Sequence, residues 1–551
     1  MLKRCLVFTT LILLMVALTA ADILAQQNMT AKTQPFDDES AKKVDAFLSQ
    51  WDKNDMPGGA VGVVKDGKLV YKRAFGMANL DSISLEPCDV PAPPPAKTQK
   101  VLCGKYEVFE NRALKKGRKI SLKVVVFPAT GQNKAPDPVF YIAGGPGSSA
   151  IEEAPYVAHE LAKVRERRDL VFLDQRGTGE SNPLNCTFFN PSDPQSYLGH
   201  WNPLEDVRRC RAELEAKADL RLYTTSIAMD DLDDVRAALG YQKINLRGGS
   251  YGTRAALEYL KRHGKRVRAV ILQGVSPTGQ FMPRDFPQHT ERALNGVLDE
   301  CAADEACRPA FPNLRAEVKT VLERLLRGPV EVEVKFPPKG QSVVVRLSRD
   351  LAAEAIRYML YQTNAAGRIP LFLHLAAQGN FTPLAEAAIF YRQRIVATGS
   401  TGMYLTVTCA EDLPWIKAGE GERMAKNTFL GDYRLRQQRE GCALWQRGEI
   451  PKDYAEPTKS EVPVLSLTGQ WDPVTPPLYG DLAAKHLPNS LHVVVPSGGH
   501  GFGGLEGLNC ISNLMLDFIN KGNTKELDTS CVKGIRRRGF LLKLPEPVKS
   551  S

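Results

Sequence analysis

The pattern of apolar residues divides this 551-residue chain into regions with different structural periods. Between residues 123 and 276, and again after residue 462, short continuous apolar runs alternate with amphipathic stretches such as residues 230–239. Continuous apolar runs of this length are typical of parallel strands that are buried on both faces. The pattern therefore predicts an α/β fold with a mainly parallel sheet covered by helices. The expected strands are residues 123–127, 139–143, 170–174, 244–247, 270–273, 464–468 and 491–495.

Helical periodicity dominates residues 277–461, which separate the two sheet-forming regions. A mostly helical insertion at this point predicts a cap over the site that the sheet forms, and a cap of this kind is expected to select the substrate. Glu411 and Asp412 in this segment are candidates for binding a positively charged group, although solvated surface acids are the more common interpretation. The expected elements are helices at residues 316–326, 351–361 and 384–393, and a hairpin at residues 330–347.

The first 25 residues have the pattern of a secretory signal peptide. Lys3 and Arg4 precede an apolar run at residues 6–18, and small residues follow it. This run is shorter than the roughly 20 apolar residues that a transmembrane helix needs. We therefore expect export with cleavage, no membrane span in the mature chain, and a periplasmic or extracellular location.

Cysteine usage agrees with export. Of the eleven cysteines, Cys5 would leave with the signal peptide, and the ten that remain fall into couples that are near in sequence. Such couples predict short-range disulfides in an oxidising compartment, although the sequence alone leaves other pairings open. The predicted pairs are Cys88 with Cys103, Cys186 with Cys210, Cys301 with Cys307, Cys409 with Cys442 and Cys510 with Cys531.

Composition and charge exclude several classes of function. The chain is 43% hydrophobic and 24% charged, as in ordinary globular proteins, and its net charge is +10. Its basic residues gather only at 261–268 and 536–538, which we interpret as solvated surface or tail, so no nucleic-acid partner is expected. No phosphate-binding loop, zinc motif or dinucleotide fingerprint is present, and we expect no cofactor and no metal. The sequence leaves the oligomeric state open.

A candidate nucleophile lies at Ser250. The pentapeptide at residues 248–252, Gly-Gly-Ser-Tyr-Gly, follows a predicted strand and opens a predicted helix at residues 253–263. In a G-x-S-x-G elbow, small neighbours let the backbone turn tightly while the serine hydroxyl projects above the sheet. In a chain with 44 glycines the pentapeptide alone is weak evidence, because it also fits a glycine-rich loop.

Two further residues complete a catalytic triad in chain order. Asp472 follows the predicted strand at 464–468, and His500 lies on a glycine-flanked loop after the strand at 491–495. A neutral imidazole can accept the serine proton near neutral pH, and a carboxylate can fix its tautomer and stabilise the imidazolium. The order Ser250, Asp472, His500 differs from the two other common serine protease orders. It predicts a serine hydrolase.

A glycine-rich loop at residues 144–149 follows the predicted strand at 139–143. Backbone N–H groups of such a loop can stabilise an oxyanion together with the N–H of the residue after the nucleophile. Gly145 and Tyr251 are the candidate donors. An ordinary strand-to-helix turn is the alternative, since Pro-Gly pairs mark turns in many proteins.

Five motifs occur in order along the chain: GGPG at 144–147, DQRGTGES at 174–181, GGSYGT at 248–253, GQWDPVTPP at 469–477 and GGHG at 498–501. Together they resemble the tripeptidyl aminopeptidase and proline iminopeptidase family of α/β-hydrolases, over about residues 85–540. The resemblance implies a serine exopeptidase that releases tripeptides, or single residues, from the free N-terminus of peptides. It places Ser250, Asp472 and His500 at the triad positions. Many proline iminopeptidases read HGGPG where this chain has Ala143 before its first glycine, so the tripeptidyl branch is the closer likeness.

An alternative function is an esterase or lipase that uses the same triad, because fold and triad do not determine the leaving group. A requirement for a free substrate amine would separate the two.

Residues 41–80 resemble the opening helix and hairpin of the serine β-lactamase and penicillin-binding superfamily. An apolar helical stripe is followed by a hairpin-like pattern turned at residues 66–67. The catalytic S-x-x-K of that superfamily does not follow, since the chain passes into a proline-rich linker at 87–95. Ser40 and Lys43 have the spacing but precede the stripe, and we expect no catalytic role for them. The stripe consists of Val44, Phe47, Leu48 and Trp51.

The expected organisation is therefore a signal peptide at 1–25, an N-terminal extension at 26–84 and a hydrolase core at 85–276. The cap at 277–461 follows, and the second part of the core occupies 462–551.

Overall fold

The computed structural model describes residues 38–49, 59–65, 68–75, 83–92, 98–336 and 340–544. The chain divides into two units, Met1–Asp81 and Ser82–Ser551. The predicted signal peptide lies outside the described residues, as do Trp51 and the predicted hairpin turn at 66–67.

The first unit contains one helix and one hairpin. Helix α2 (Asp38–Leu48) precedes the antiparallel strands β1 (Gly59–Lys65) and β2 (Lys68–Phe75). Lys43 lies on the exposed side of α2, where its ammonium forms an ion pair with Glu39 at 2.9 Å. The helix and hairpin predicted for this region are confirmed in the described residues.

The second unit is built on one sheet. Within the described residues, nine strands form it in the order β13-β12-β9-β8-β6-β7-β5-β4-β3. The pairs from β13 to β7 are parallel, and those from β7 through β5 and β4 to β3 are antiparallel. The predicted mainly parallel sheet is confirmed. Its strands are β3 (Glu86–Pro91), β4 (Thr98–Phe109), β5 (Lys119–Phe127), β6 (Val139–Ile142), β7 (Leu170–Leu173), β8 (Ile244–Gly249), β9 (Val267–Gln273), β12 (Val464–Gly469) and β13 (Ser490–Val495).

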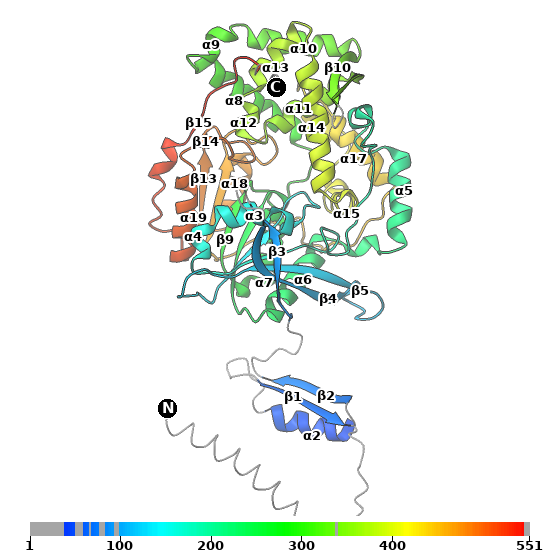
Figure 1. Ribbon diagram of the computed structural model, residues 1–551, viewed down its shortest axis with the longest axis vertical. Coiled ribbons are helices and arrows are strands. Elements are labelled where there is room, and N and C mark those ends of the chain that lie inside the picture. The colour runs from blue at the N-terminus through cyan, green and yellow to red at the C-terminus, as the bar shows by residue number, and fades with distance from the viewer. Residues whose placement is uncertain are drawn as a thin grey trace, which may run out of the picture. The chain divides into compact units, whose positions relative to one another are not determined.

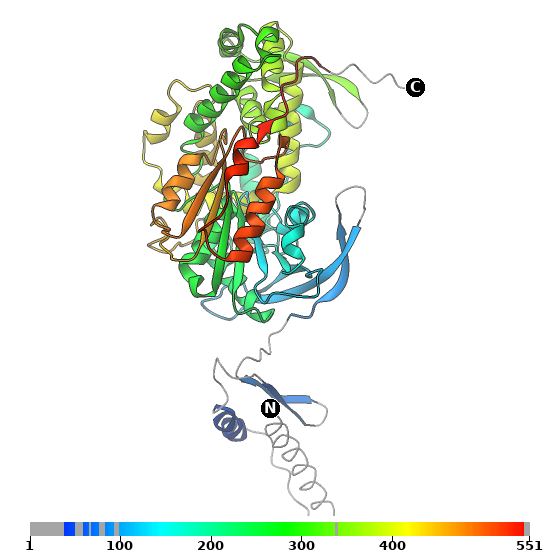
Figure 2. The ribbon, with the colours of Figure 1, turned by 90° about the vertical axis from the view of Figure 1, so that its left-hand side faces the viewer.

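Helices cover both faces of this sheet because alternate side chains of each buried strand point to opposite sides. Val124 of β5 packs in the apolar cluster that includes α6 and α7, whereas the adjacent Val125 packs in the cluster that includes α3, α4 and α19. Figure 2 shows α19 as the red-orange helix lying across one face of the strands. The helices around the sheet are α3 (Ala150–Glu160), α4 (Ala162–Arg165), α6 (Thr225–Ala238), α7 (Tyr251–His263), α18 (Pro477–Ala484) and α19 (Asn509–Lys521). Helix α5 (Leu204–Glu215) packs instead against α15 (Thr401–Glu411) and α17 (Tyr433–Ala443).

A long insertion connects β9 to β12 and is mostly helical. Figure 1 shows α8, α10, α11, α13 and α14 gathered at the end of the unit toward which β13 points. The helices and the hairpin predicted for this region are confirmed, and every second residue of β10 is buried. The elements are α8 (Phe286–Ala303), α9 (Cys307–Ala310), α10 (Leu314–Leu326), β10 (Val330–Phe336), β11 (Gln341–Leu347), α11 (Arg349–Met359), α12 (Thr363–Ala366), α13 (Ile369–Ala377), α14 (Thr382–Thr398), α15 (Thr401–Glu411), α16 (Glu420–Ala425) and α17 (Tyr433–Ala443).

Part of the expected proline-rich linker is a strand instead. β3 pairs antiparallel with β4 at the edge of the sheet, and it contains Pro87 and Pro91. Proline cannot donate to a strand ladder, but an edge strand needs partners on one side only. The interpretation of this stretch as a linker is therefore wrong for residues 86–91. The disulfide between Cys88 and Cys103 joins β3 to β4.

All five predicted disulfides are present in the described residues.

Short antiparallel strands β14 (Leu505–Glu506) and β15 (Arg536–Arg537) bring the C-terminal segment back onto the unit. The Arg537 side chain is only 7% exposed and forms an ion pair with Glu300 at 2.9 Å, so the interpretation of this basic cluster as surface or tail is wrong for Arg537. Among the described residues, no helix combines the length and the apolar character needed to cross a bilayer.

Candidate active site

Ser250 occupies a sharp turn between β8 and α7. Its backbone has φ 54° and ψ −125°, a conformation that L-residues seldom adopt. The Ser250 N–H donates to the carbonyl of Gln273 on the adjacent strand at 2.8 Å, which holds the turn against the sheet. This is the geometry of the predicted nucleophile elbow.

The glycines of the elbow permit close packing of backbone on backbone. A Cβ on Gly248 would lie 2.4 Å from the carbonyl oxygen of Gly252. A Cβ on Gly252 would lie 2.1 Å from the carbonyl oxygen of Ile142 in β6. No side chain fits at either position, so the elbow sequence is required by sterics.

Asp472 and His500 are hydrogen-bonded to one another. His500 Nδ1 lies 2.7 Å from Asp472 Oδ2, and Thr475 Oγ1 contacts both groups. The N–H groups of Val474 and Thr475 donate to Asp472 Oδ1 at 2.9 and 2.8 Å. Complete burial opposes the ionisation of Asp472, but His500 and these hydrogen bonds outweigh it and hold the pKa of Asp472 below its ordinary value. An ionised carboxylate is what a catalytic histidine needs at Nδ1.

Backbone contacts bring His500 close to the elbow. A Cβ on Gly274 would lie 3.0 Å from His500 Cε1, and Gly274 directly follows the residue that accepts the Ser250 N–H. The Gly501 N–H donates to the carbonyl of Tyr361 at 2.7 Å, and the Tyr361 ring packs edge-on against the imidazole at 4.9 Å. The insertion therefore fixes the position of the histidine loop.

The glycine-rich loop lies against Ser250. A Cβ on Gly144 would be 3.1 Å from the Cβ of Ser250, and Gly145 has a positive φ of 106°. Ser149 caps α3 and donates to Asp174 Oδ1 at 2.7 Å, so the DQRGTGES segment braces this loop. Tyr251 begins α7, where the first N–H groups have no partner within the helix.

A family model described as the alpha/beta hydrolase fold matches residues 137–503, which is more than half of the chain and includes all three predicted triad residues. The chain belongs to the α/β-hydrolase family. The fold and the elbow make it a serine hydrolase.

Several curated relatives of this α/β-hydrolase are peptidases by name. The serine protease Hip1 of Mycobacterium tuberculosis is 27% identical over 482 residues, covering 78% of this chain and 87% of the relative. The tripeptidyl aminopeptidase of Streptomyces lividans is 30% identical over 196 residues, covering 32% and 35%. The proline iminopeptidase of Neisseria gonorrhoeae is 27% identical over 139 residues, covering 25% and 32%.

Ser250 and His500 of this hydrolase line one cavity of about 530 Å³. The glycine-rich loop, the elbow and the histidine loop form one side of it, and α11, α14, α15 and α17 of the insertion contribute to the other. Sequence reasoning missed several of its residues, because they carry no local motif. The charged ones are Glu153, Arg247, Arg357, Arg392 and Arg434.

Glu411 and Asp412 do not line this cavity and are not solvated acids either. Both are fully buried at the end of α15. Glu411 accepts from the N–H and hydroxyl of Thr225, each at 2.6 Å, and burial raises its pKa to about 7. Asp412 accepts from Arg254 at 2.7 Å. Both acids therefore connect the insertion to the sheet domain, and neither is placed to meet a substrate.

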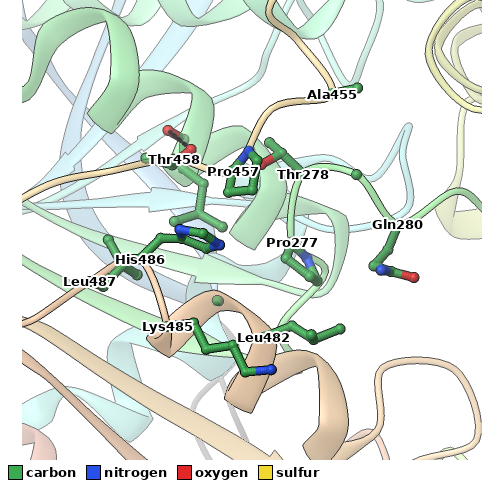
Figure 3. A pocket seen from close by; sticks show the side chains of 13 residues that line it. Pro277, Thr278, Gln280, Ala455, Pro457, Thr458, Leu482, Lys485, His486 and Leu487 are labelled. Carbon is green, nitrogen blue, oxygen red and sulfur yellow. Dashed lines mark hydrogen bonds between the residues drawn. The ribbon is translucent and has the colours of Figure 1, made fainter.

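A second cavity of about 190 Å³ contains none of the predicted catalytic residues. Figure 3 shows it between the loop after β9, the segment around Pro457 and the end of α18, with the His486 ring among its walls. Its lining among the described residues includes no carboxylate that could orient the histidine there. Of the two cavities, the larger one is therefore the one lined by Ser250 and His500.

Proposed function

We propose that this chain is an exported serine exopeptidase that releases residues from the free N-terminus of peptides. The observation that carries the proposal is that Ser250, His500 and a half-buried carboxylate, Glu153, line one cavity. The names of the relatives, a serine protease and two aminopeptidases, support a peptide substrate. Five disulfides among the described residues support an oxidising compartment, in agreement with the signal peptide expected from the sequence.

In this proposal Ser250 attacks the scissile carbonyl while His500 removes its proton. Asp472 keeps the imidazole in the required tautomer and stabilises the imidazolium. The N–H groups of Gly145 and Tyr251 stabilise the oxyanion of the tetrahedral intermediate. His500 then protonates the leaving amine, and water hydrolyses the acyl-enzyme. The insertion acts as a cap that restricts the cavity to a chain end.

Glu153 is the proposed binding site for the substrate ammonium. It is the only carboxylate among the cavity-lining residues of the described chain. It accepts a hydrogen bond from the Tyr141 hydroxyl, and that hydroxyl lies 3.3 Å from where a Cβ on Gly249 would be, one residue before the nucleophile. Burial raises the pKa of Glu153, although Tyr141 and Arg247 oppose the rise. A carboxylate this close to the elbow can pair with an amine near the scissile bond.

Replacing Glu153 by glutamine is expected to raise KM for peptide anilides with a free amine by about tenfold or more, since a charge-assisted pair contributes roughly 1.5–3 kcal/mol. Hydrolysis of a short p-nitrophenyl ester should change far less, because that substrate has no ammonium. Glu152→Gln on the same helix is the matched control, because Glu152 does not line the cavity. Equal losses on both substrates would remove the ammonium role from Glu153.

A further inference from the structure

Three arginines occupy the part of the cavity wall that the insertion forms. Arg357 comes from α11, Arg392 from α14 and Arg434 from α17. Their exposed fractions are only 1%, 3% and 4%. We call these three residues the arginine cluster. Three guanidinium groups that are nearly excluded from solvent require an explanation, because burial of a charge is costly unless the charge is paired.

The acids around the cluster balance only one of its three charges. Glu354 Oε2 accepts from Arg357 Nη2 at 2.7 Å and lies 4.0 Å from Arg434 Nε. Arg392 forms no ion pair with any described residue, and its Nη2 donates instead to the carbonyl of His200 at 2.6 Å. Two positive charges thus remain without a counter-charge. Uncompensated buried charge of this kind favours the binding of an anion.

Several donors of the cluster also have no hydrogen-bond acceptor. Arg392 Nη1, Arg434 Nε and Arg434 Nη1 are buried without a partner in the described residues. The remaining nitrogen of Arg434, Nη2, donates to the Tyr404 hydroxyl at 3.0 Å. Buried polar groups are nearly always satisfied in native proteins, so donors left free at a cavity wall indicate a missing acceptor.

An aromatic side chain holds two of the arginines in place. The guanidinium carbons of Arg434 and Arg392 lie 3.5 and 4.1 Å from the centre of the Trp201 ring. The side-chain oxygen of Gln437 accepts a hydrogen bond from the backbone N–H of Trp201 at 3.0 Å and so holds Trp201 in position. Cation–π contacts orient the two guanidinium groups but bring no negative charge. The cluster is therefore preorganised and still lacks an anionic partner.

One side chain links the cluster to the catalytic histidine. The Tyr361 hydroxyl accepts from Arg357 Nη1 at 2.8 Å, and its ring packs against His500. A group bound at the cluster and a carbonyl bound at Ser250 can therefore belong to one small substrate within the same cavity.

We propose that the arginine cluster binds a carboxylate of the substrate, supplied either by a free peptide C-terminus or by an acidic side chain. This inference deepens the proposed exopeptidase function and rests on it. With Glu153 near the elbow and the cluster on the insertion, the cavity carries opposite charges at two places. It is suited to a short peptide that has both a free amine and a carboxylate.

The test compares peptides that differ only in this charge. Tetra-alanine is compared with its C-terminal amide, and tetra-alanine amides carrying one glutamate are compared with the same peptides carrying glutamine. In the wild-type chain, kcat/KM should be about ten- to a hundred-fold higher for the carboxylate that reaches the cluster, as expected for a hydrogen-bonded charge. The first pair reports on the C-terminus, and the second pair reports on an acidic side chain.

Variants then assign that preference to the cluster. Arg434→Gln and Arg392→Gln should each bring the ratio of kcat/KM for the acidic peptide to kcat/KM for the neutral peptide toward one. Arg434→Lys should retain part of the preference for the acidic peptide. The ratio is measured within one variant, so a partial loss of folded protein does not affect it. Arg349→Gln is the matched control, because Arg349 lies in the same insertion, outside the cavity lining, and bonds to backbone carbonyls. Its ratio should equal that of the wild type.

A second readout separates this inference from the proposed function. Succinate should inhibit wild-type hydrolysis of a neutral p-nitrophenyl ester more strongly than succinamide does, and Arg434→Gln should abolish the difference. Cleavage of neutral peptides without preference for acid, together with equal inhibition by the two compounds, would overturn the carboxylate site and leave the exopeptidase intact. Failure to cleave any peptide, with selective inhibition by succinate, would overturn the exopeptidase and leave the anion site.

Discussion

Replacing Ser250 by alanine is expected to lower kcat by about a million-fold while the chain keeps its fold, since removal of a catalytic serine has this effect in a comparable triad. The attacking oxygen is lost, and only the oxyanion donors and substrate binding remain. The variant should unfold at nearly the same temperature as the wild type, because the elbow is held by hydrogen bonds of the Ser250 backbone, which alanine keeps. Turnover of peptide anilides and thermal unfolding measure the two effects.

Ser400→Ala is the matched control for this variant. Ser400 lines the same cavity, and its hydroxyl has no hydrogen-bond partner among the described residues. Its loss should change turnover only slightly. If Ser250→Ala retained more than a few per cent of wild-type turnover, the nucleophile would have to be another residue.

Replacing Asp472 by asparagine is expected to lower kcat by about ten-thousand-fold, because an amide favours the wrong histidine tautomer. In the wild type, Asp472 Oδ2 faces His500 Nδ1 at 2.7 Å and is fully buried. The amide NH₂ group can donate to that nitrogen and leave the proton on the nitrogen that should accept from Ser250. Measuring kcat across pH checks the result, since activity should recover partly at alkaline pH, where the barrier to proton removal falls.

A second aspartate–histidine pair provides the control. Asp481 Oδ1 lies 2.8 Å from His492 Nδ1, but neither residue lines the cavity. Asp481→Asn should leave kcat unchanged within about twofold. Equal losses in the two variants would mean that the effect of Asp472→Asn comes from general destabilisation.

The residues of the elbow and the triad could be predicted because their constraints are local. Only glycine fits at positions 248 and 252. Asp472 and His500 are predicted because each follows an apolar strand pattern and lies in the loop after it. The sheet could be predicted for the same reason, since continuous apolar runs such as β6 and β7 are buried along their whole length. Disulfide pairing followed from the nearness of the cysteines in sequence.

The residues that shape the cavity could not be predicted, because tertiary packing alone brings them together. Arg392 and Arg434 lie on different helices and both contact the Trp201 ring, and no spacing in the sequence relates these three residues. Glu411 is the opposite case, a residue that the sequence did single out but whose surroundings it did not reveal. An acid in a helical segment is usually solvated, and the burial of Glu411 is revealed by its tertiary contacts with Thr225 and Tyr454. Strand β3 was missed because an edge position tolerates the prolines that argue against a central strand.

The most direct test of the central claim is hydrolysis of p-nitroanilides that carry one or three residues, each with a free or an acetylated N-terminus, by the mature chain. The account predicts cleavage that requires the free amine, is absent in Ser250→Ala, and is faster for one of the two lengths, which decides between a tripeptidyl and a single-residue enzyme. Cleavage of a short-chain p-nitrophenyl ester alone, with no anilide cleaved whether its amine is free or acetylated, would contradict the exopeptidase and assign the same triad to an esterase.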